Sequence, residues 1–277
     1  MPPLLDDKVI TSWNGLMIGA MAFGYRVLRE PRYLESAERA ARFVLSALVR
    51  PDGGLYRTTR AGRAHIDAYL EDYAYLADAL IGLYEAGAPS EFLSRALALA
   101  ERLRKDFGDA GGGFFSTAAG HEALVARPRE GHDGAVPSAN AVAARALARL
   151  GRHFGREDLV ERARQAVDAY GGLIARSPRA FATSLAVIDF LESPPAELAI
   201  VGRRGSEDRE AIEAAVGRQF LPHHVIGHSD PEASDSASPL LAGKTLVAGK
   251  AALYVCRNFA CQAPLVDAAA VGPALGS

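Results

Sequence analysis

Residues 70–87 read LEDYAYLADALIGLYEAG, and they contain the clearest helical pattern of the chain. Its apolar positions recur at three- and four-residue steps from Leu70 to Tyr84, which predicts an amphipathic helix that ends at Gly87. A second repeat of the same spacing follows between Phe92 and Leu103. The short connection between the two repeats predicts a helical hairpin.

Similar repeats flank this hairpin on both sides. They predict helices over about 12–29 and 31–48 before it, and over about 138–150 and 159–170 after it. Residues 180–192 supply a seventh, shorter helix. The chain is therefore expected to be mainly α-helical, built from consecutive antiparallel helix pairs.

The long connections between the hairpins resemble each other. Residues 51–62 read PDGGLYRTTRAG and residues 110–121 read AGGGFFSTAAGH, about 59 residues further on. Glycines next to β-forming residues indicate a short strand hairpin or a tight loop. Helix pairs that repeat at such a period bury their apolar faces against their neighbours, so the array is predicted to curl into an α/α toroid or a solenoid.

The pattern changes near Pro194. A short apolar run, ELAIVG, predicts a strand, and it is followed by a helical stretch and by two further strands, HHVIGH and AALYVC. We therefore expect two domains: a toroid segment of about three and a half hairpins over 1–193, and a small α/β unit with a C-terminal tail over 194–277.

Composition limits the class of partner. The 31 basic and 33 acidic residues are interspersed and give a formal charge of −2, so neither a nucleic acid nor a membrane is an expected partner. The start of the sequence does not resemble a signal peptide, which favours a cytoplasmic location. Cys256 and Cys261 are expected to be two buried thiols, no metal site is predicted at the histidines of HHVIGH, and no cofactor is expected.

Polar residues gather at one end of the predicted array. Every second helix runs in the same direction, so the N-termini near residues 12, 70 and 138 share one rim. Three clusters lie there, and His65, His121 and His132 lie near them as possible proton carriers. The clusters are Asp7, Trp13 and Asn14; Glu71, Asp72 and Tyr73; and Asp133, Ser138 and Asn140.

Convergent carboxylates, amides and aromatic rings are what a ligand rich in hydroxyl groups requires. Asp72 and Asp133 are the candidate catalytic acid and base, because two carboxyls in different environments can divide these roles. The other seven residues of the clusters are candidate substrate-binding groups. The alternative is purely structural, since Asp and Ser before a helix are helix caps, and Trp13 and Tyr73 fit the apolar core equally well.

Four segments resemble a known family: DDKVITSWNGLMIGA, LEDYAYLADALIGLYEA, LVARPREGHDGAVPSANAVAA and YVCRNFACQAPLVD. In this order they are similar to the C-terminal half of the thioredoxin-domain-containing proteins related to the spermatogenesis-associated family. The resemblance implies an α/α six-hairpin toroid similar to N-acylglucosamine 2-epimerases and six-hairpin glycosidases. It also implies an N-terminal thioredoxin-like domain, which this sequence lacks.

Seven long helices are fewer than the twelve of a closed six-hairpin ring. The apolar edge at the first two helices is then open, and we expect the missing half of the toroid, a thioredoxin-like domain or another chain as its partner. Met1 is expected to be an internal start or the start of a gene fragment. The functional hypotheses are an epimerase-like or isomerase-like enzyme or a glycosidase-like enzyme acting on a sugar, and a non-catalytic binding or scaffold module. The sequence does not decide between them.

Overall fold

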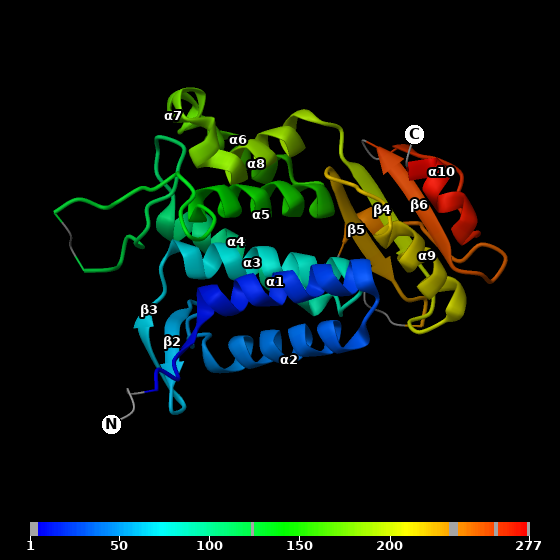
Figure 1. Cartoon of the computed structure of the whole chain (residues 1–277), viewed down its shortest axis with the longest axis horizontal. Coiled ribbons are helices and arrows are strands. Elements are labelled where there is room, and N and C mark those ends of the chain that lie inside the picture. The colour runs from blue at the N-terminus through cyan, green and yellow to red at the C-terminus, as the bar shows by residue number, and fades with distance from the viewer. Residues whose placement is uncertain (1–4, 123–124, 233–237, 258–259, 276–277) are drawn as a thin grey trace.

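A computed structural model describes residues 5–122, 125–232, 238–257 and 260–275. Its first part consists of helical hairpins (Figure 1). The pairs are α1 (Thr11–Leu28) with α2 (Pro31–Ala47), α3 (Leu70–Glu85) with α4 (Glu91–Phe107), and α5 (Ala139–Phe154) with α6 (Glu157–Asp168). The short helices α7 (Gly171–Arg176), η1 (Pro178–Phe181) and α8 (Ala182–Glu192) follow. The predicted hairpin array is confirmed.

Local chemistry explains where these helices begin and end. Pro31 occupies the first turn of α2, where its missing amide hydrogen is not needed. The Ser138 side chain accepts a hydrogen bond from the backbone amide of Ala141 and so caps α5. That helix ends at Gly155, whose φ of 61° is readily adopted by glycine.

The loop at residues 51–62 belongs to a small sheet of three strands. These strands are β1 (Val9–Ile10), β2 (Tyr56–Arg60) and β3 (Arg63–Asp67), and β2 pairs antiparallel with both neighbours. The prediction of a strand hairpin is confirmed here. The similar loop at 110–121 forms only an isolated bridge between Gly108 and Phe114 among the described residues.

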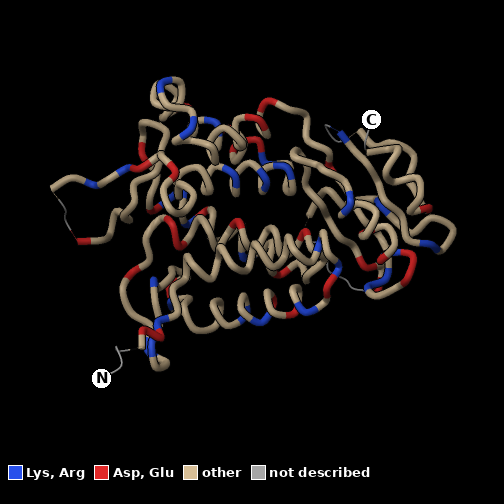
Figure 2. Tube along the Cα trace, in the orientation of Figure 1, with Lys and Arg blue, Asp and Glu red and all other residues tan. Residues whose placement is uncertain are grey.

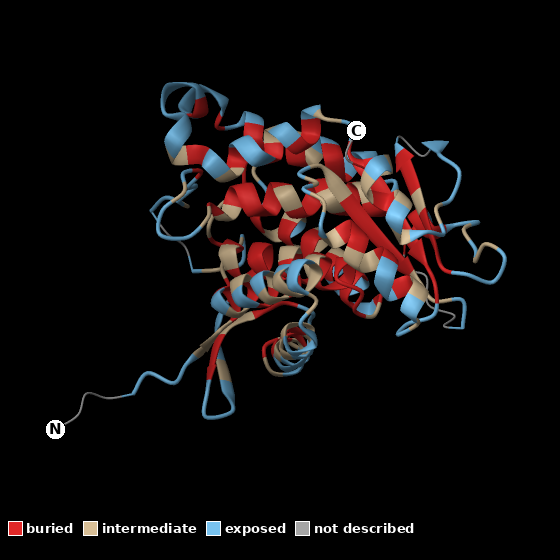
Figure 3. Cartoon of the chain, turned by 45° about the vertical axis from the view of Figure 1, so that its right-hand side comes forward, coloured by how far each residue is buried: buried red, intermediate tan, exposed pale blue. Residues whose placement is uncertain are grey.

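Helix α3 lies at the centre of the helical layer, between α1 and α5 (Figure 1). Most of its residues are buried, including Leu76, Leu80 and Leu83. Buried positions gather on the central helices and on the adjoining sheet (Figure 3). Residues 70–87 therefore form the middle of the main hydrophobic core.

Helix α1 departs from the expected burial. Its contact with α3 is made by a narrow face that includes Gly15, Ile18 and Ala22. Exposed positions form one stripe along the helix, Trp13, Met17, Ala20, Phe23 and Val27, and Leu28 at its C-terminal end is exposed as well. Trp13 is 66% exposed and Phe23 is 64% exposed, so the alternative that placed Trp13 in the apolar core is not observed. The apolar periodicity identified a face that this chain leaves uncovered.

The last part of the chain is a mixed sheet in the order β5-β4-β6-β7. Strand β4 (Ala196–Val201) pairs parallel with β5 (His224–Ser229) and antiparallel with β6 (Ala252–Arg257), which pairs with β7 (Ala260–Cys261). Helix α9 (Glu207–Gly217) and the short elements η2 (Pro239–Leu241), η3 (Ala268–Ala270) and α10 (Val271–Leu275) complete it. The predicted strands and the long helix are confirmed.

The sheet joins the helices through one of its faces. Ala199 of β4 and Val225 of β5 belong to the main core, whereas Leu198 packs on the opposite face with Ile212 of α9. Alternate residues of a strand point to opposite faces, so one strand serves both cores. The helices end at Glu192 and the sheet begins at Ala196. The division into two domains at 193/194 stays a prediction.

Cys256 and Cys261 form a disulfide that connects β6 to β7. The expectation of two buried thiols is therefore wrong. A separation of 5 residues allowed no inference of pairing from the sequence, but the antiparallel register places the two cysteines opposite each other. Within the described residues, no helix is both long and apolar enough to cross a membrane.

Candidate functional site

A cavity of about 330 Å³ opens at the N-terminal ends of α3 and α5. Its walls come from β2, from the start of α3, from the segment before α5 and from the glycine-rich loop near Ser116. The side chains that give it polar and aromatic character are Arg57, Tyr69, Glu71, Tyr75, Glu130, His132, Ser138 and Asn140. This cavity is the candidate functional site.

Asn140 fixes the loop that forms one wall. Its side-chain oxygen accepts a hydrogen bond of 2.7 Å from the backbone amide of Phe114, and its amide nitrogen donates to the carbonyls of Phe114 and Glu130 at 3.0 and 2.9 Å. Asn140 is buried, so these bonds satisfy the polar atoms that burial would otherwise leave unpaired. Its observed role is to shape the cavity.

Arg57 forms the opposite wall and comes from β2. Its guanidinium donates to Glu71 at 2.7 Å and lies over the ring of Tyr69, 4.8 Å from the centroid. A cation placed on an aromatic face and paired with a carboxylate holds all three side chains in one geometry. Glu71 is therefore preorganised at the cavity.

Asp72 is buried beside this wall and joins two helices. One carboxylate oxygen accepts a hydrogen bond from the amide of Tyr69 at 2.9 Å, and the other accepts from the amide of Ser12 at 2.9 Å. The first bond is part of the capping box of α3, and the second satisfies the N-terminus of α1. Burial raises the pKa of Asp72 to about 6, although these amides and Arg57 act in the opposite direction.

Asp133 also acts through backbone amides. Its two carboxylate oxygens accept hydrogen bonds of 2.8 Å from the amides of Ser138 and Thr183. Burial raises the pKa of Asp133, but the hydrogen bonds from Thr183 and Ser138 outweigh this effect and leave the pKa below its usual range. Neither Asp72 nor Asp133 lines the cavity. Both carboxylates occupy the capping positions that were the structural alternative.

The remaining predicted residues fall into two groups. Glu71, Ser138 and Asn140 line the cavity together. Tyr73 is buried instead, packs on Phe107 and accepts a hydrogen bond from the amide of Leu55 at 2.9 Å. Its core alternative is the one observed.

The cluster of Asp7, Trp13 and Asn14 lies outside the cavity lining. Asn14 donates at 2.9 Å to the carbonyl of Ile10, the residue that precedes α1, and Asp7 pairs with Arg60 at the surface. Trp13 is exposed on α1 and does not line the cavity. The helix N-termini do share one rim, as helix direction predicted. Among the predicted site residues, however, only Glu71, Ser138 and Asn140 line the cavity.

Sequence reasoning missed Arg57, Tyr69, Tyr75 and Glu130. Arg57 and Glu130 lie in connections, where periodicity carries no information about direction. Tyr69 precedes the apolar repeat of α3, and Tyr75 lies between its apolar positions. Only the approach of α5 brings Tyr75 to the carbonyl of Pro137, to which its hydroxyl donates. The described residues contain no group of three or more His, Cys, Asp or Glu side chains arranged to hold a metal ion.

The helical array is the fold of sugar epimerases and glycosidases. The chain superposes on cellobiose 2-epimerase from Bacillus thermoamylovorans with a TM-score of 0.50 and 20% identity, over 60% of this chain and 45% of that one. It superposes on a GH76 α-mannanase from Bacteroides thetaiotaomicron with a TM-score of 0.55 and 15% identity, over 84% and 66%. At this identity the likeness establishes the α/α toroid fold alone.

The sequence is homologous to part of spermatogenesis-associated protein 20. It is 32% identical to the human protein over 279 residues, covering 96% of this chain and 36% of that protein. The rat protein is 30% identical, over 95% and 35%. The chain thus spans about a third of the length of these relatives. No protein-family model matches it.

Proposed function

We propose that the cavity at the N-termini of α3 and α5 binds a sugar or a similar polyhydroxylated small molecule. The observation that carries the proposal is a concave site of about 330 Å³ in which a preorganised carboxylate, a guanidinium and two tyrosines converge. Such sites suit sugars, because aromatic faces pack against C–H groups while charged groups bond the hydroxyls. The fold shared with a sugar epimerase and a mannanase supports the same class of ligand.

The groups available for acid–base chemistry at the cavity are Glu71, Glu130 and His132. Catalysis by Asp72 and Asp133 stays a prediction, and it requires each carboxylate to give up an amide that it now caps. Within our proposal these two residues position the cavity walls. The reactions proposed for such a site are epimerisation, isomerisation and glycoside hydrolysis, as part of carbohydrate metabolism in the cytoplasm.

A non-catalytic module is the second candidate function. The observation that favours it is that both carboxylates expected to be catalytic are engaged in helix capping. In this version the cavity presents a bound ligand or client to another part of a longer protein, such as a thioredoxin-like domain. The coverage of only about a third of its relatives is compatible with such further domains.

Thermal shift of the purified chain against monosaccharides, N-acetylated sugars and short glycans tests the proposal. We expect a saturable rise in Tm with at least one sugar, lost in Glu71→Gln and in His132→Ala. His65→Ala is the matched control, because His65 is exposed on β3 and does not line the cavity. A cooperative transition that no sugar shifts would contradict the proposal.

Turnover assays with any sugar that binds distinguish the catalytic function from the non-catalytic one. A catalytic site predicts product formation that is abolished by Glu71→Gln. A binding module predicts saturable binding with no product in wild type.

A further inference from the structure

A second cavity, of about 340 Å³, follows α1, α3 and α5 along the layer and shares Tyr75 with the first. Its walls include Gly15, Gly19 and Gly82, together with the apolar side chain of Phe23. A Cβ atom built on Gly82 would meet no atom within 4 Å, so the groove is open at that point. Arg26, Asp78, Arg145 and Arg149 complete the lining.

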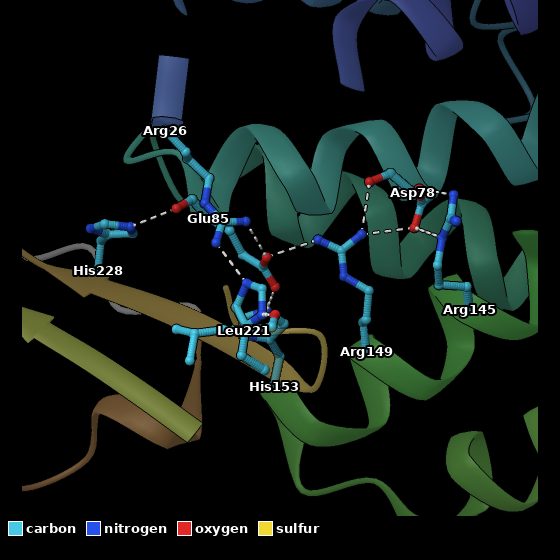
Figure 4. A network of polar contacts seen from close by, with 9 residues as sticks. Arg26, Asp78, Glu85, Arg145, Arg149, His153, Leu221 and His228 are labelled. Atoms are coloured by element: carbon cyan, nitrogen blue, oxygen red, sulfur yellow. Dashed lines mark hydrogen bonds and ion pairs between the residues drawn. The ribbon is translucent and has the colours of Figure 1, made fainter. Parts of the chain in front are cut away.

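These charged residues form a continuous network (Figure 4). Asp78 of α3 accepts hydrogen bonds from Arg145 at 2.8 Å and from Arg149 at 2.7 Å, both on α5. Arg149 also donates to Glu85 at 2.9 Å, and Arg26 of α1 lies 3.5 Å from the same carboxylate. The network therefore connects all three helices that form the groove.

Three histidines border the network: His153, His224 and His228, the last of which bonds the backbone carbonyl of Glu85 at 2.9 Å. His224 accepts from Arg26 at 2.6 Å through Nε2, while its Nδ1 donates to the carbonyl of Leu221. Burial is the largest cause that lowers the pKa of His224, to about 4, so this ring is neutral at neutral pH. His153 donates from Nε2 to Glu85 at 2.9 Å, and its buried Nδ1 has no hydrogen-bond partner.

The charges of the network do not cancel. Arg26, Arg145 and Arg149 contribute three positive charges, and Asp78 and Glu85 contribute two negative ones. The pKa values of Asp78 and Glu85 are below their usual range, so both are ionised. Burial acts to raise both values, but Arg145 and Arg149 outweigh it at Asp78. At Glu85 the opposing groups are Arg149 and His153. Burying a net charge is costly unless a counter-ion accompanies it. The arginines of the network thus outnumber its carboxylates by one, which leaves an excess of positive charge.

Arg145 is the member of the network that is most accessible. Its side chain is 38% exposed, compared with 14% for Arg149 and 16% for Arg26. Its Nε and Nη2 atoms bond Asp78. Figure 2 shows basic positions recurring along α5, the helix that carries Arg145 and Arg149. A ligand that enters the groove meets this guanidinium first.

We propose that the groove binds the oxyanion of a small acidic ligand, with Arg145 as its principal contact. Tyr75 lines both cavities, so a sugar acid or a sugar phosphate can occupy the first cavity with its polar body and place its anionic group in the groove. The sugar part of this inference rests on the proposed function, whereas the oxyanion part rests on the groove alone. Guanidinium groups bind both carboxylates and phosphates. Because Nε and Nη2 of Arg145 already bond Asp78, the oxyanion of the ligand is expected at the Nη1 side of this guanidinium.

Isothermal titration calorimetry on the whole chain tests this, with D-glucuronate, D-glucose 6-phosphate and D-glucose at constant ionic strength. We expect the two anions to bind at least about tenfold more tightly than glucose, which corresponds to about 1.4 kcal/mol. The tighter of the two anions identifies a carboxylate or a phosphate as the preferred group. Arg145→Gln removes the excess charge and should abolish the preference. Arg39→Gln, an exposed arginine on α2, should retain it.

Equal affinity for glucose and both anions would overturn the inference and leave the proposed function standing. No binding of any probe by a folded chain would overturn both. An anion preference that survives in Arg145→Gln would also overturn the inference. If Arg145→Gln does not fold, competition replaces it: inorganic phosphate should displace glucuronate from wild type, and failure to displace it counts against the groove.

Discussion

Helices α1 and α3 lie side by side in the same layer and carry similar apolar repeats, yet they are buried to very different extents. Helix α3 has α1 on one side and α5 on the other, and most of its residues are inaccessible. Helix α1 packs on α2 and α3 and leaves the stripe from Trp13 to Val27 exposed. Apolar periodicity therefore identifies a helix face suited to packing, whereas the burial of that face depends on whether a neighbouring helix or strand covers it.

The largest contrast should come from truncating one apolar side chain on each helix. Leu80 of α3 is fully buried, so Leu80→Ala should lower the free energy of unfolding by about 2–5 kcal/mol. Phe23→Ala on α1 should change it by less than about 0.5 kcal/mol, because that side chain already lies in solvent. Urea unfolding measures both values. Equal losses in the two variants would show that the α1 stripe is covered in solution.

Asp72 should make stability depend on pH through the contact between the two helices. Its pKa is about 6 in the folded protein and about 3.9 when unfolded, so the folded state holds the proton more tightly. Its stabilising contribution is complete below about pH 4 and is lost as the pH rises through about 6, by up to about 3 kcal/mol. Urea unfolding of wild type and Asp72→Asn across this range checks the difference. A difference that does not change with pH would contradict the raised pKa.

Gly15 should be the sensitive point on the α1 face that meets α3. A Cβ atom there would lie 2.8 Å from the backbone carbon of Tyr75, so Gly15→Ala should destabilise the fold by about 1–3 kcal/mol. Gly19→Ala is the matched control, since its Cβ would meet Ala79 at an ordinary 3.7 Å and alanine favours a helix. Thermal melts should therefore move in opposite directions. A neutral result at Gly15 would mean that the helices separate easily.

The smallest effect on stability is expected at the stripe itself, where the readout is hydrophobic exposure. Phe23→Glu should reduce the fluorescence of a bound hydrophobic dye and change the Tm by less than about 2 °C. Arg39→Gln on α2 serves as the surface control. Dye fluorescence that is unaffected by Phe23→Glu would show that the stripe is not the apolar surface the dye detects.

The candidate site was partly predictable. Helix direction placed Glu71, Ser138 and Asn140 on one rim, and these three residues do line one cavity. The same argument treated Tyr73 as an equal candidate, but its position in the turn of α3 directs it to Phe107 in the core. Arg57 could not be anticipated, because it reaches Glu71 only through the fold of the β2–β3 hairpin against α3.

The helices, their pairing into hairpins and the strands near the C-terminus could be predicted from the sequence alone. These features depend on residues that lie within a few positions of one another. Only the tertiary structure decided that Asp72 caps a helix 60 residues away, that Arg149 joins Asp78 to Glu85, and that the α1 stripe is left uncovered. Charge pairing and burial act over a few ångströms of space. A one-dimensional pattern cannot state which distant residues come within that distance.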